Sequence, residues 1–480
     1  MKSSQRKTLF LCALGLGCVL FFLLLLPRLS EGTLWHTDEA YTAERSREML
    51  LLNDYANVHL YFEPSFNKPP LQYYLTTLSM RLFDDPELCV RIWSLLYATG
   101  CLILIAWVYL QLRPEKYIEA FAAAFFVATY PHFVDNARLG LLDMGALFYL
   151  LLTLLGSFKA LRNPKTGWLL AGVAAGLGCW QKNTLSLGAL TVVSLFFACW
   201  KETRASMRNR WWFYGILLAL SIGLAWPVLQ FISHPADYSA ALQKDWSHLT
   251  TQDAFIDPQD YFLYLKWMAR KWGPVSLLAL IAIMGSIVSP VIRKERRLVI
   301  IISLAVGYIL TISLFKFKRN YYVLPAIPFL SITLVYFYAS IWRTKTWLLY
   351  SLYAGCGFTT ILLSAYHYMR PSKDYAPQVA LIREVARTAD ASEALCFICK
   401  DRHFESIESL FPAFVLYYGQ LNRPIAAHTL RSLSRLPAGT PACGILYAGV
   451  FEEAKPFFID YQELAHNGDY IAFRARRSER

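Results

Sequence analysis

Long apolar runs with few charged residues dominate the chain up to residue 367. About eleven of them approach the 20 residues that a helix needs to cross a bilayer. Runs such as 211–232, 274–292 and 347–366 contain no Asp, Glu, Lys or Arg, whereas a soluble helix keeps one polar face. The pattern predicts a polytopic α-helical membrane protein. The runs lie at 8–27, 91–112, 117–134, 142–158, 166–181, 183–200, 211–232, 274–292, 298–315, 321–342 and 347–367.

The first apolar run follows Lys2, Arg6 and Lys7, so a cleaved signal peptide has to be weighed against a retained helix. A signal peptide has an apolar region of about 7–15 residues and small residues at its cleavage site. The run at 8–27 is longer, and the stretch from Pro27 to Ser30 offers no such pattern. We therefore expect a permanent membrane helix.

The connections between the runs differ in charge, which predicts the orientation of the chain. With the N-terminus inside, the inner connections are rich in Lys and Arg, and their acidic residues are Glu115, Glu202 and Glu295. Cytoplasmic loops carry such an excess of positive charge. We expect a cytoplasmic N-terminus, an odd number of spans and a C-terminal segment outside. The inner connections are 1–7, 113–116, 159–165, 201–210, 293–297 and 343–346.

Composition agrees with this interpretation. The 480 residues are 56% hydrophobic and 17% charged, whereas about a quarter of the residues of a soluble domain are charged. The formal net charge is +13, and the nearly balanced segment 368–480 contributes little of it. Nucleic-acid binding needs a basic face on a soluble surface, so we expect no nucleic-acid partner.

Three segments outside the runs are long enough to carry chemistry: 28–90, 233–273 and 368–480. In the first, an amphipathic helix is expected from Thr37, its N-cap, to about Leu52, and a second helix restarts at Leu71. We divide the chain into a transmembrane domain at 1–367, with an outer loop at 28–90, and an extracytoplasmic domain at 368–480.

The C-terminal segment has the pattern of a small α/β domain. Its cysteines, Cys396, Cys399 and Cys443, lie where one disulfide could form. The single Cys396-Phe-Ile-Cys399 motif has no second Cys or His pair, which argues against a zinc or redox site. The expected elements are helices at 376–389 and 406–419, strands at 394–399, 424–427 and 443–448, and a hairpin with Asn467-Gly468 as its turn.

Polar residues at the predicted outer ends of the runs carry the most functional information, because ionisable groups at membrane depth are costly and usually functional. The predicted topology places all of them on one side of the membrane. They are Asp38, Glu39, Lys68, Arg138, Asp143, Lys182, Lys316, Lys318, Arg319, Tyr321 and Tyr322.

Most of these residues stand in motifs that resemble one family. The stretch from His36 to Tyr41, continued to Met49, is similar to the first outer loop of the lipid A aminoarabinose transferases. These enzymes belong to the GT-C superfamily of membrane glycosyltransferases, as do the protein O-mannosyltransferases. The other similar motifs are Asn67-Lys68-Pro69-Pro70, Leu141-Leu142-Asp143-Met144, Trp180-Gln181-Lys182, and Lys318 with Tyr321-Tyr322-Val323-Leu324-Pro325.

The resemblance implies a GT-C-like fold and an activity. An enzyme of this family would transfer a sugar from a polyprenyl-phosphate carrier to lipid A, lipopolysaccharide or another cell-envelope glycan on the outer face of the inner membrane. Negative charge collects on the departing lipid phosphate, and preorganised cations stabilise such charge. Lys68 is the first candidate for binding this phosphate, followed by Lys318, Tyr322 and Lys182.

The attacking group needs a carboxylate if the acceptor is a hydroxyl, and Asp38 is the candidate general base. Glu39 and Asp143 are secondary candidates, for acceptor positioning or metal binding. Structural alternatives remain: Asp38 and Glu39 could stabilise a helix dipole, Asp143 could be an N-cap, and Lys68 and Lys182 could be interface anchors.

Two positions depart from the family pattern. Tyr41 stands where the family has Arg, and Asn67 stands where it has an acidic residue. In the aminoarabinose enzymes that acidic residue helps to hold a metal ion. A divalent metal ion is therefore an open cofactor for this chain, and the metal ligands are not assigned.

Two other functions compete with this one. A protein O-glycosyltransferase would use the same donor with a different acceptor. A polytopic transporter would also place ionisable groups within its bundle, but it more often shows two similar halves with interrupted helices, which this sequence lacks.

Overall fold

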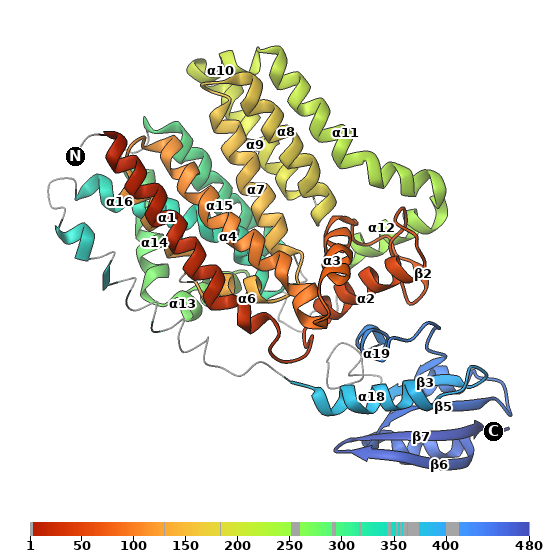
Figure 1. The fold of residues 1–480 in the computed structure, drawn as a ribbon. Helices are drawn as coiled ribbons and strands as arrows, with labels where there is room; N and C mark the ends of the chain where they lie inside the picture. The colour runs from red at the N-terminus through yellow and green to blue at the C-terminus, as the bar shows by residue number, and fades with distance from the viewer. Residues whose placement is uncertain are drawn as a thin grey trace. The chain divides into compact units, whose positions relative to one another are not determined.

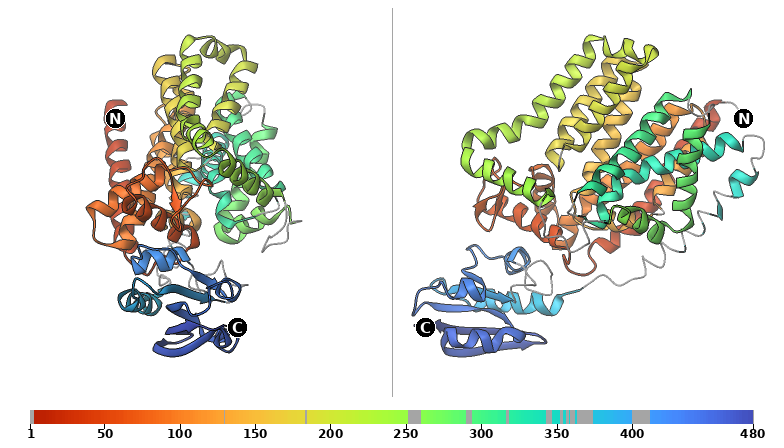
Figure 2. Two further views of the ribbon diagram at one scale, coloured as in Figure 1. Left: turned by 90° about the vertical axis from the view of Figure 1, so that its right-hand side faces the viewer. Right: turned by 180° about the vertical axis from the view of Figure 1, so that it is seen from behind.

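The computed structural model describes residues 3–128, 130–182, 184–250, 260–289, 294–315, 318–342, 347–351, 374–399 and 412–479, with a few isolated residues between 352 and 373. The chain divides into two compact units (Figures 1 and 2). The helical unit comprises Met1–Arg28, Phe66–Gln72 and Arg91–Arg370, and the α/β unit comprises Leu29–Ser65, Tyr73–Val90 and Pro371–Arg480. Most of the segment 28–90 thus belongs with the C-terminal residues.

Apolar helices build the helical unit. Among the described residues there is a helix at each of the first ten predicted runs, and most of the run at 347–367 lies outside them. The helices are α1 (Ser3–Leu25), α4 (Pro86–Leu112), α5 (Tyr117–Ala128), α6 (Pro131–Arg138), α7 (Asp143–Lys159), α8 (Pro164–Gln181), α9 (Leu185–Cys199), α10 (Lys201–Met207), α11 (Arg210–Ser233), α12 (Pro235–Thr250), α13 (Leu263–Trp272), α14 (Pro274–Val288), α15 (Arg296–Leu314), η3 (Asn320–Ala326) and α16 (Ile327–Ile341).

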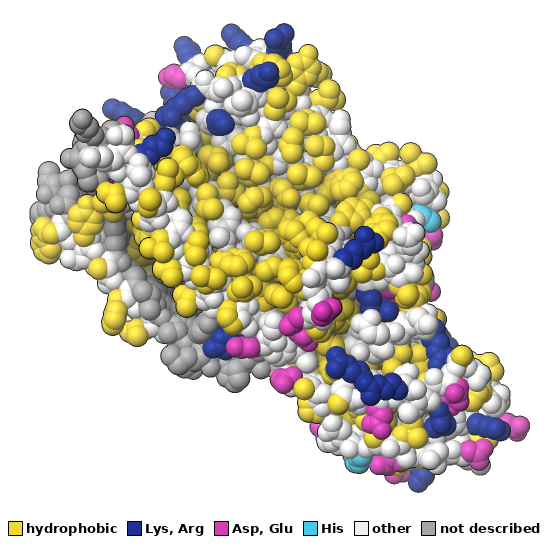
Figure 3. All heavy atoms as spheres, viewed as in Figure 1, with side chains coloured by type: hydrophobic (Ala, Val, Ile, Leu, Met, Phe, Trp, Pro, Cys, Tyr) yellow, Lys and Arg dark blue, Asp and Glu magenta, His cyan; other side chains and the backbone are white. Residues whose placement is uncertain are grey.

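Five helices in the described part of the chain are long and apolar enough to cross a membrane. A sixth candidate is the pair α6 and α7, which bend by 113° at the break between them. The apolar helices α5, α9 and α14 are shorter. In Figure 3, hydrophobic side chains cover a broad face of the helical unit, and Lys and Arg gather at the end formed by α10. These features are those of a multi-pass membrane protein.

Small residues allow α8 to pack closely on its neighbours. A Cβ atom on Gly172 of α8 would lie 2.2 Å from the carbonyl oxygen of Gly215 on α11, so only glycine fits there. Without a hydrophobic driving force between helices in lipid, such close backbone approach supplies the packing energy. The views agree that α7, α8, α9 and α11 run alongside one another (Figures 1 and 2).

A five-stranded mixed sheet forms the centre of the C-terminal part of the α/β unit. Its order is β4-β3-β5-β7-β6, with parallel pairing of β3 to β4 and β5 and antiparallel pairing in the rest. The strands are β3 (Ala394–Cys399), β4 (Ala427–Thr429), β5 (Pro441–Tyr447), β6 (Phe458–Asn467) and β7 (Tyr470–Arg477).

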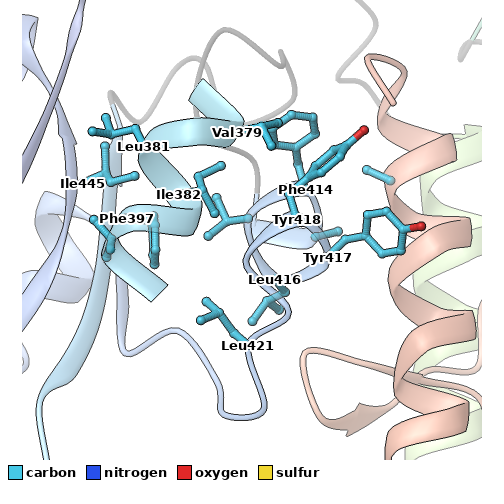
Figure 4. Packing of buried hydrophobic residues seen from close by; sticks show 14 of the residues in the cluster. Val379, Leu381, Ile382, Phe397, Phe414, Leu416, Tyr417, Tyr418, Leu421 and Ile445 are labelled. Carbon is cyan, nitrogen blue, oxygen red and sulfur yellow. The ribbon is translucent and has the colours of Figure 1, made fainter. Parts of the chain in front are cut away.

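Helices α18 (Ala376–Thr388) and α19 (Pro412–Gly419) share a hydrophobic core with this sheet, and α2 (Thr37–Leu51) joins the same core (Figure 4). Ala40 and Ala43 of α2 are fully buried in it. The hydroxyl of Tyr417 on α19 donates to the carbonyl of Pro86, and that of Tyr418 donates to Glu87, at 2.8 and 2.6 Å. The unit is completed by β1 (His59–Leu60), β2 (Glu63–Pro64) and α3 (Leu71–Leu82), whose first two residues belong to the helical unit.

Three local predictions were wrong. The strand expected at 424–427 begins at Ala427, because Pro424 has no N–H to give to a ladder. The hairpin turn is Gly468-Asp469, since Asn467 still pairs with Tyr470, and Gly468 takes the positive φ of +59° that such a turn needs. The N-cap of α2 is His36 rather than Thr37.

Candidate active site

The carboxylate of Asp143 and the ammonium group of Lys182 form an ion pair in the helical unit. The atoms Oδ1 and Nζ are 2.6 Å apart, and both side chains are largely buried. Asp143 is the first residue of α7 and does not cap it, because the N-cap is Leu142 and no side chain caps this end. The N-cap alternative for Asp143 is therefore wrong. Lys182 directly follows α8. The start of α7 and the end of α8 thus position a largely buried pair of opposite charges.

Two tyrosines complete the surroundings of Lys182. Its Nζ lies 5.7 Å from the ring centre of Tyr321 and 5.8 Å from that of Tyr322, within the range of cation–π attraction. The hydroxyl of Tyr308 on α15 donates to the carbonyl of Tyr322 at 2.9 Å, which fixes the 3-10 helix η3. The structure thus brings together Asp143, Lys182 and Tyr322 from sequence segments far apart in the chain.

Lys318 is buried, with 3% of its surface exposed, in the short segment between α15 and η3. Its Nζ lies 5.8 Å from the ring centre of Tyr261. Asp260 is next to this tyrosine and forms an ion pair with Lys266 at 2.8 Å. The pKa of Asp260 is lowered mainly by that hydrogen bond to Lys266, and Lys318 adds to the effect. A buried lysine among apolar helices is a candidate for binding an anionic group, because such a charge is costly to bury without a function.

Lys68 lies in the segment Phe66–Gln72 of the helical unit and is half-buried. The ring of Phe66 packs on those of His234 and Tyr238, with centroids 5.4 and 5.9 Å apart. These contacts hold the segment against α12. His234 thus has a packing role, whereas the side chains of His248 and Asp253 lie outside the described residues.

A buried amide pair, which the sequence prediction missed, links the lysine-bearing segments. The Nε2 of Gln181 donates to Oε1 of Gln72 at 2.8 Å, and the hydroxyl of Tyr97 donates to Oε1 of Gln181 at 3.3 Å. Both glutamines are fully buried. Gln181 precedes Lys182, and Gln72 lies four residues after Lys68. The sequence signal for this pair was Gln181 at the end of an apolar run, because a buried amide needs a hydrogen-bond partner.

Asp38 and Glu39 lie in the first turn of α2, in the α/β unit. The backbone N–H of Asp38 donates to Nδ1 of His36 at 3.2 Å, and the carboxylate of Glu39 accepts from the backbone N–H of His36 at 3.5 Å. Glu39 is buried and closes this capping box. Asp38 is half-buried, and its carboxylate takes no part in the cap.

Further along α2, charged side chains are buried rather than solvated. Arg47 binds Glu44 through two hydrogen bonds of 2.8 and 2.7 Å, and it also donates to the carbonyl of Leu421 at 2.7 Å. Leu421 follows α19, so this ion pair ties α2 to the C-terminal residues of the same unit. Helix α2, which was expected to be amphipathic, therefore buries these charges inside the α/β unit.

Glu48 holds a strained turn in the α/β unit. Its carboxylate accepts the backbone N–H groups of Tyr61 and Phe62 at 2.8 and 3.0 Å. These two residues join β1 to β2 with φ angles of +63° and +66°, which side chains other than glycine rarely adopt. Burial, followed by the proximity of Glu44, raises the pKa of Glu48 to about 8.

The described residues do not fit a divalent metal site within either unit. No group of three or more His, Cys, Asp or Glu side chains is gathered in the part of the chain that the structure describes. The carboxylate of Asp143 is neutralised by Lys182, and the amide of Asn67 supplies no charge. Cys396 and Cys443 are free thiols in the sheet, and the side chain of Cys399 lies outside the described residues.

Comparison with known proteins confirms the family resemblance. Residues 67–229 match the family of dolichyl-phosphate-mannose-protein mannosyltransferases. The chain is 30% identical over 241 residues to the undecaprenyl phosphate-alpha-4-amino-4-deoxy-L-arabinose arabinosyl transferase 2 of Pseudomonas fluorescens. This stretch covers 49% of the chain and 41% of that relative, so the match spans about two fifths of the relative's length.

Solved structures share the fold over nearly the whole chain. ArnT from Cupriavidus metallidurans bound to undecaprenyl phosphate has a TM-score of 0.72 at 15% identity, covering 98% of each chain. An Archaeoglobus fulgidus oligosaccharyltransferase in complex with Zn and sulfate has a TM-score of 0.53 at 11% identity, covering 93% of this chain and 70% of that one.

These findings define the class: the chain has the fold of the GT-C membrane glycosyltransferases, a polytopic helical bundle with a C-terminal mixed sheet. Within that class it is similar in sequence to the aminoarabinose transferases. The fold class predicted from the sequence is confirmed.

Proposed function

We propose that the protein is a glycosyltransferase that moves a sugar from a polyprenyl-phosphate carrier to lipid A or another lipopolysaccharide acceptor. The observation that carries the proposal is the largely buried Asp143–Lys182 ion pair beside Tyr322, in a helical unit that shares the fold of ArnT. The relatives named for aminoarabinose transfer and the relative bound to undecaprenyl phosphate support this donor class.

The lysines serve the leaving group. When the glycosidic bond breaks, the electron pair stays with the phosphate oxygen, and a fixed ammonium group stabilises the new charge better in a dry site than in water. Lys182 and Lys318 are both buried or nearly so, and Lys68 adds a third cation. The phenol of Tyr322 can donate a hydrogen bond to the same phosphate.

Asp38 is the proposed base. A hydroxyl acceptor loses its proton as it attacks the anomeric carbon, and a half-buried carboxylate that takes no part in the helix cap can receive it. Glu39 is buried and engaged in the cap, so its role is to hold the start of α2. Asp143 is engaged by Lys182, and its role is to hold that lysine in place.

The location follows from the donor. Nucleotide sugars stay in the cytoplasm, so a site on the outer side needs a lipid-borne donor. We place the enzyme in the inner membrane with the N-terminus cytoplasmic, because the basic connections mark the inner side. The helical unit then forms the transmembrane part of the glycosyltransferase, and the α/β unit, which contains Asp38 and the C-terminal residues, is periplasmic.

A transfer assay tests the proposal. Purified full-length protein is incubated with a radiolabelled undecaprenyl-phosphate sugar and, in parallel, with lipid A, lipopolysaccharide core or a Ser/Thr-containing peptide. Label in a lipid A or lipopolysaccharide acceptor supports the proposal. Label in the peptide supports the protein O-glycosyltransferase alternative, which the match to the protein mannosyltransferase family favours. Movement of an unmodified solute across the membrane without label transfer contradicts both.

A further inference from the structure

A pocket of about 480 Å³ opens among the basic connections of the helical unit. Its walls come from the start of α8, from α10 and from the residues that lead into α15. Protein pockets that bind small molecules have volumes of about 300–1,000 Å³. The volume is thus sufficient for a phosphate-bearing headgroup.

The pocket is far from the candidate active site. Pro164 lines it and begins α8, and the same helix ends next to Lys182. Arg296 lines it and begins α15, which ends just before Lys318. At a rise of 1.5 Å per residue, α8 spans about 26 Å, close to the thickness of the hydrocarbon core of a bilayer. The pocket therefore lies at the opposite end of the bundle and is a separate site.

Three cations line the pocket, and one of them has no partner among the described residues. Lys294 makes no ion pair or hydrogen bond in that part of the chain and is exposed. Arg296 binds Glu202, whose side chain is 66% exposed. Exposed pairs of this kind contribute little free energy, so the guanidinium group can exchange the carboxylate for a phosphate at small cost.

Arg297 is held more firmly. It donates from Nε to Glu295 at 2.9 Å and from Nη1 to the carbonyl of Gln111. The backbone contact fixes the guanidinium group at the pocket wall without neutralising it. An anion entering the pocket thus meets one free ammonium group and two guanidinium groups, against two carboxylates that are already paired with the arginines.

The surroundings match a membrane interface. The guanidinium group of Arg296 lies 5.5 Å from the ring centre of Trp200, and Nζ of Lys165 lies 5.2 Å from that of Trp211. Trp with Lys or Arg is the usual composition of the interfacial belt. Further along α11, Phe213 and Leu217 expose half or more of their surface. Figure 3 shows the same arrangement, with cations at this end and hydrophobic side chains below it.

We propose that this pocket binds the phosphate headgroup of an anionic phospholipid, whose acyl chains lie on the adjacent exposed apolar side chains. Basic pockets between helices recognise such headgroups. Free phosphate offers similar anionic oxygens but lacks the acyl chains, so the lipid is the ligand that uses both parts of the surface.

Native mass spectrometry of the full-length protein tests the proposal. The protein is released from phosphatidylcholine nanodiscs, and phosphatidylglycerol is then added at increasing concentration. The affinity for phosphatidylglycerol is compared for wild type, Lys294→Gln and Arg296→Gln. Removing one charge should weaken binding of phosphatidylglycerol about fivefold and leave phosphatidylcholine unaffected. Lys116→Gln is the matched control, because this exposed lysine lies in another basic connection and does not line the pocket.

Three results would overturn the proposal. The first is equal affinity of wild type for the two lipids. The second is an equal loss in Lys116→Gln, which would mean that diffuse surface charge binds the lipid. The third is displacement of phosphatidylglycerol by an equal concentration of inorganic phosphate, which would make soluble phosphate the ligand. Wild-type thermal stability of the Lys294→Gln variant separates a binding defect from misfolding.

Discussion

Gln181 donates its side-chain amide to Gln72 at a distance of 2.8 Å, and this bond joins the segment carrying Lys182 to the segment carrying Lys68. Both amides are fully buried, so neither can exchange its partner for water. A buried hydrogen bond left unmade costs about 1–3 kcal/mol. The pair therefore sets the relative position of two lysines that the sequence separates by more than a hundred residues.

We expect Gln181→Ala to reduce kcat of sugar transfer about 10–100-fold with a smaller change in KM, because the lysines are misplaced rather than removed. The measurement is steady-state transfer with labelled donor. Gln111→Ala is the control, because its side chain lies at the other end of the helical unit. A variant that unfolds at lower temperature but keeps kcat would show that the amide only stabilises the fold.

The Asp143–Lys182 ion pair allows structure and chemistry to be separated. Lys182→Met leaves a buried carboxylate without its cation, which typically costs about 3–5 kcal/mol. Adding Asp143→Asn removes the unpaired charge and should restore most of the melting temperature while transfer stays undetectable. Thermal unfolding and label transfer are measured on both variants. Recovery of transfer in the double variant would contradict a direct role of the ammonium group.

Asp38 and Glu39 are adjacent but should respond differently. Asp38→Asn keeps the shape of the side chain and removes the base, so transfer to a hydroxyl acceptor should fall by at least about 100-fold with normal membrane insertion. Glu39→Ala removes one of the two halves of the capping box of α2 and should cost up to about 1 kcal/mol of stability with part of the activity retained. Equal activity of Asp38→Asn and wild type would exclude Asp38 as the base.

The raised pKa of Glu48 predicts a pH-dependent stability. Because its pKa in the folded state is about 8 against an ordinary 4.5, the folded protein holds an extra proton between these values. This contribution to the free energy of unfolding is complete below about pH 4.5 and is lost as the pH rises through 8. Between pH 5 and 9 the melting temperature should fall, and Glu48→Gln should flatten the curve.

Tryptophan fluorescence during heating measures the melting temperature of wild type and Glu48→Gln at each pH. Glu63→Gln is the matched control, because Glu63 is exposed in the neighbouring strand β2 and should keep the wild-type slope. An unchanged slope in Glu48→Gln would assign the pH dependence to other groups.

The sequence predicted the parts of the fold that a bilayer determines. Charge-free runs such as 211–232 can only be stable as buried or lipid-facing helices, and α11 confirms that run. The runs 117–134 and 142–158 were predicted as separate spans, but nothing local in the sequence encodes the 113° angle between α6 and α7. The motifs around Asp143 and Lys182 identified both residues, but their pairing depends on how two helix ends meet.

Helix α2 shows the opposite limitation. Glu44, Arg47 and Glu48 have the spacing of a solvated helix face, and periodicity alone predicted one. In the structure all three are buried, because each finds a partner in a segment distant in sequence or one turn away. A pattern of charged residues indicates exposure only when the charges have no partners within the fold, because a buried charge must be paired. One sequence does not show which distant segments supply such partners.

The turn at Tyr61 and Phe62 also makes one element of the α/β unit depend on another. Two consecutive residues with positive φ are unfavourable by about 1–2 kcal/mol each, so the hairpin of β1 and β2 has little reason to form alone. Its turn becomes stable once the carboxylate of Glu48 is in place to accept both N–H groups. The stability of this hairpin, which leads the chain toward Lys68, therefore depends on helix α2.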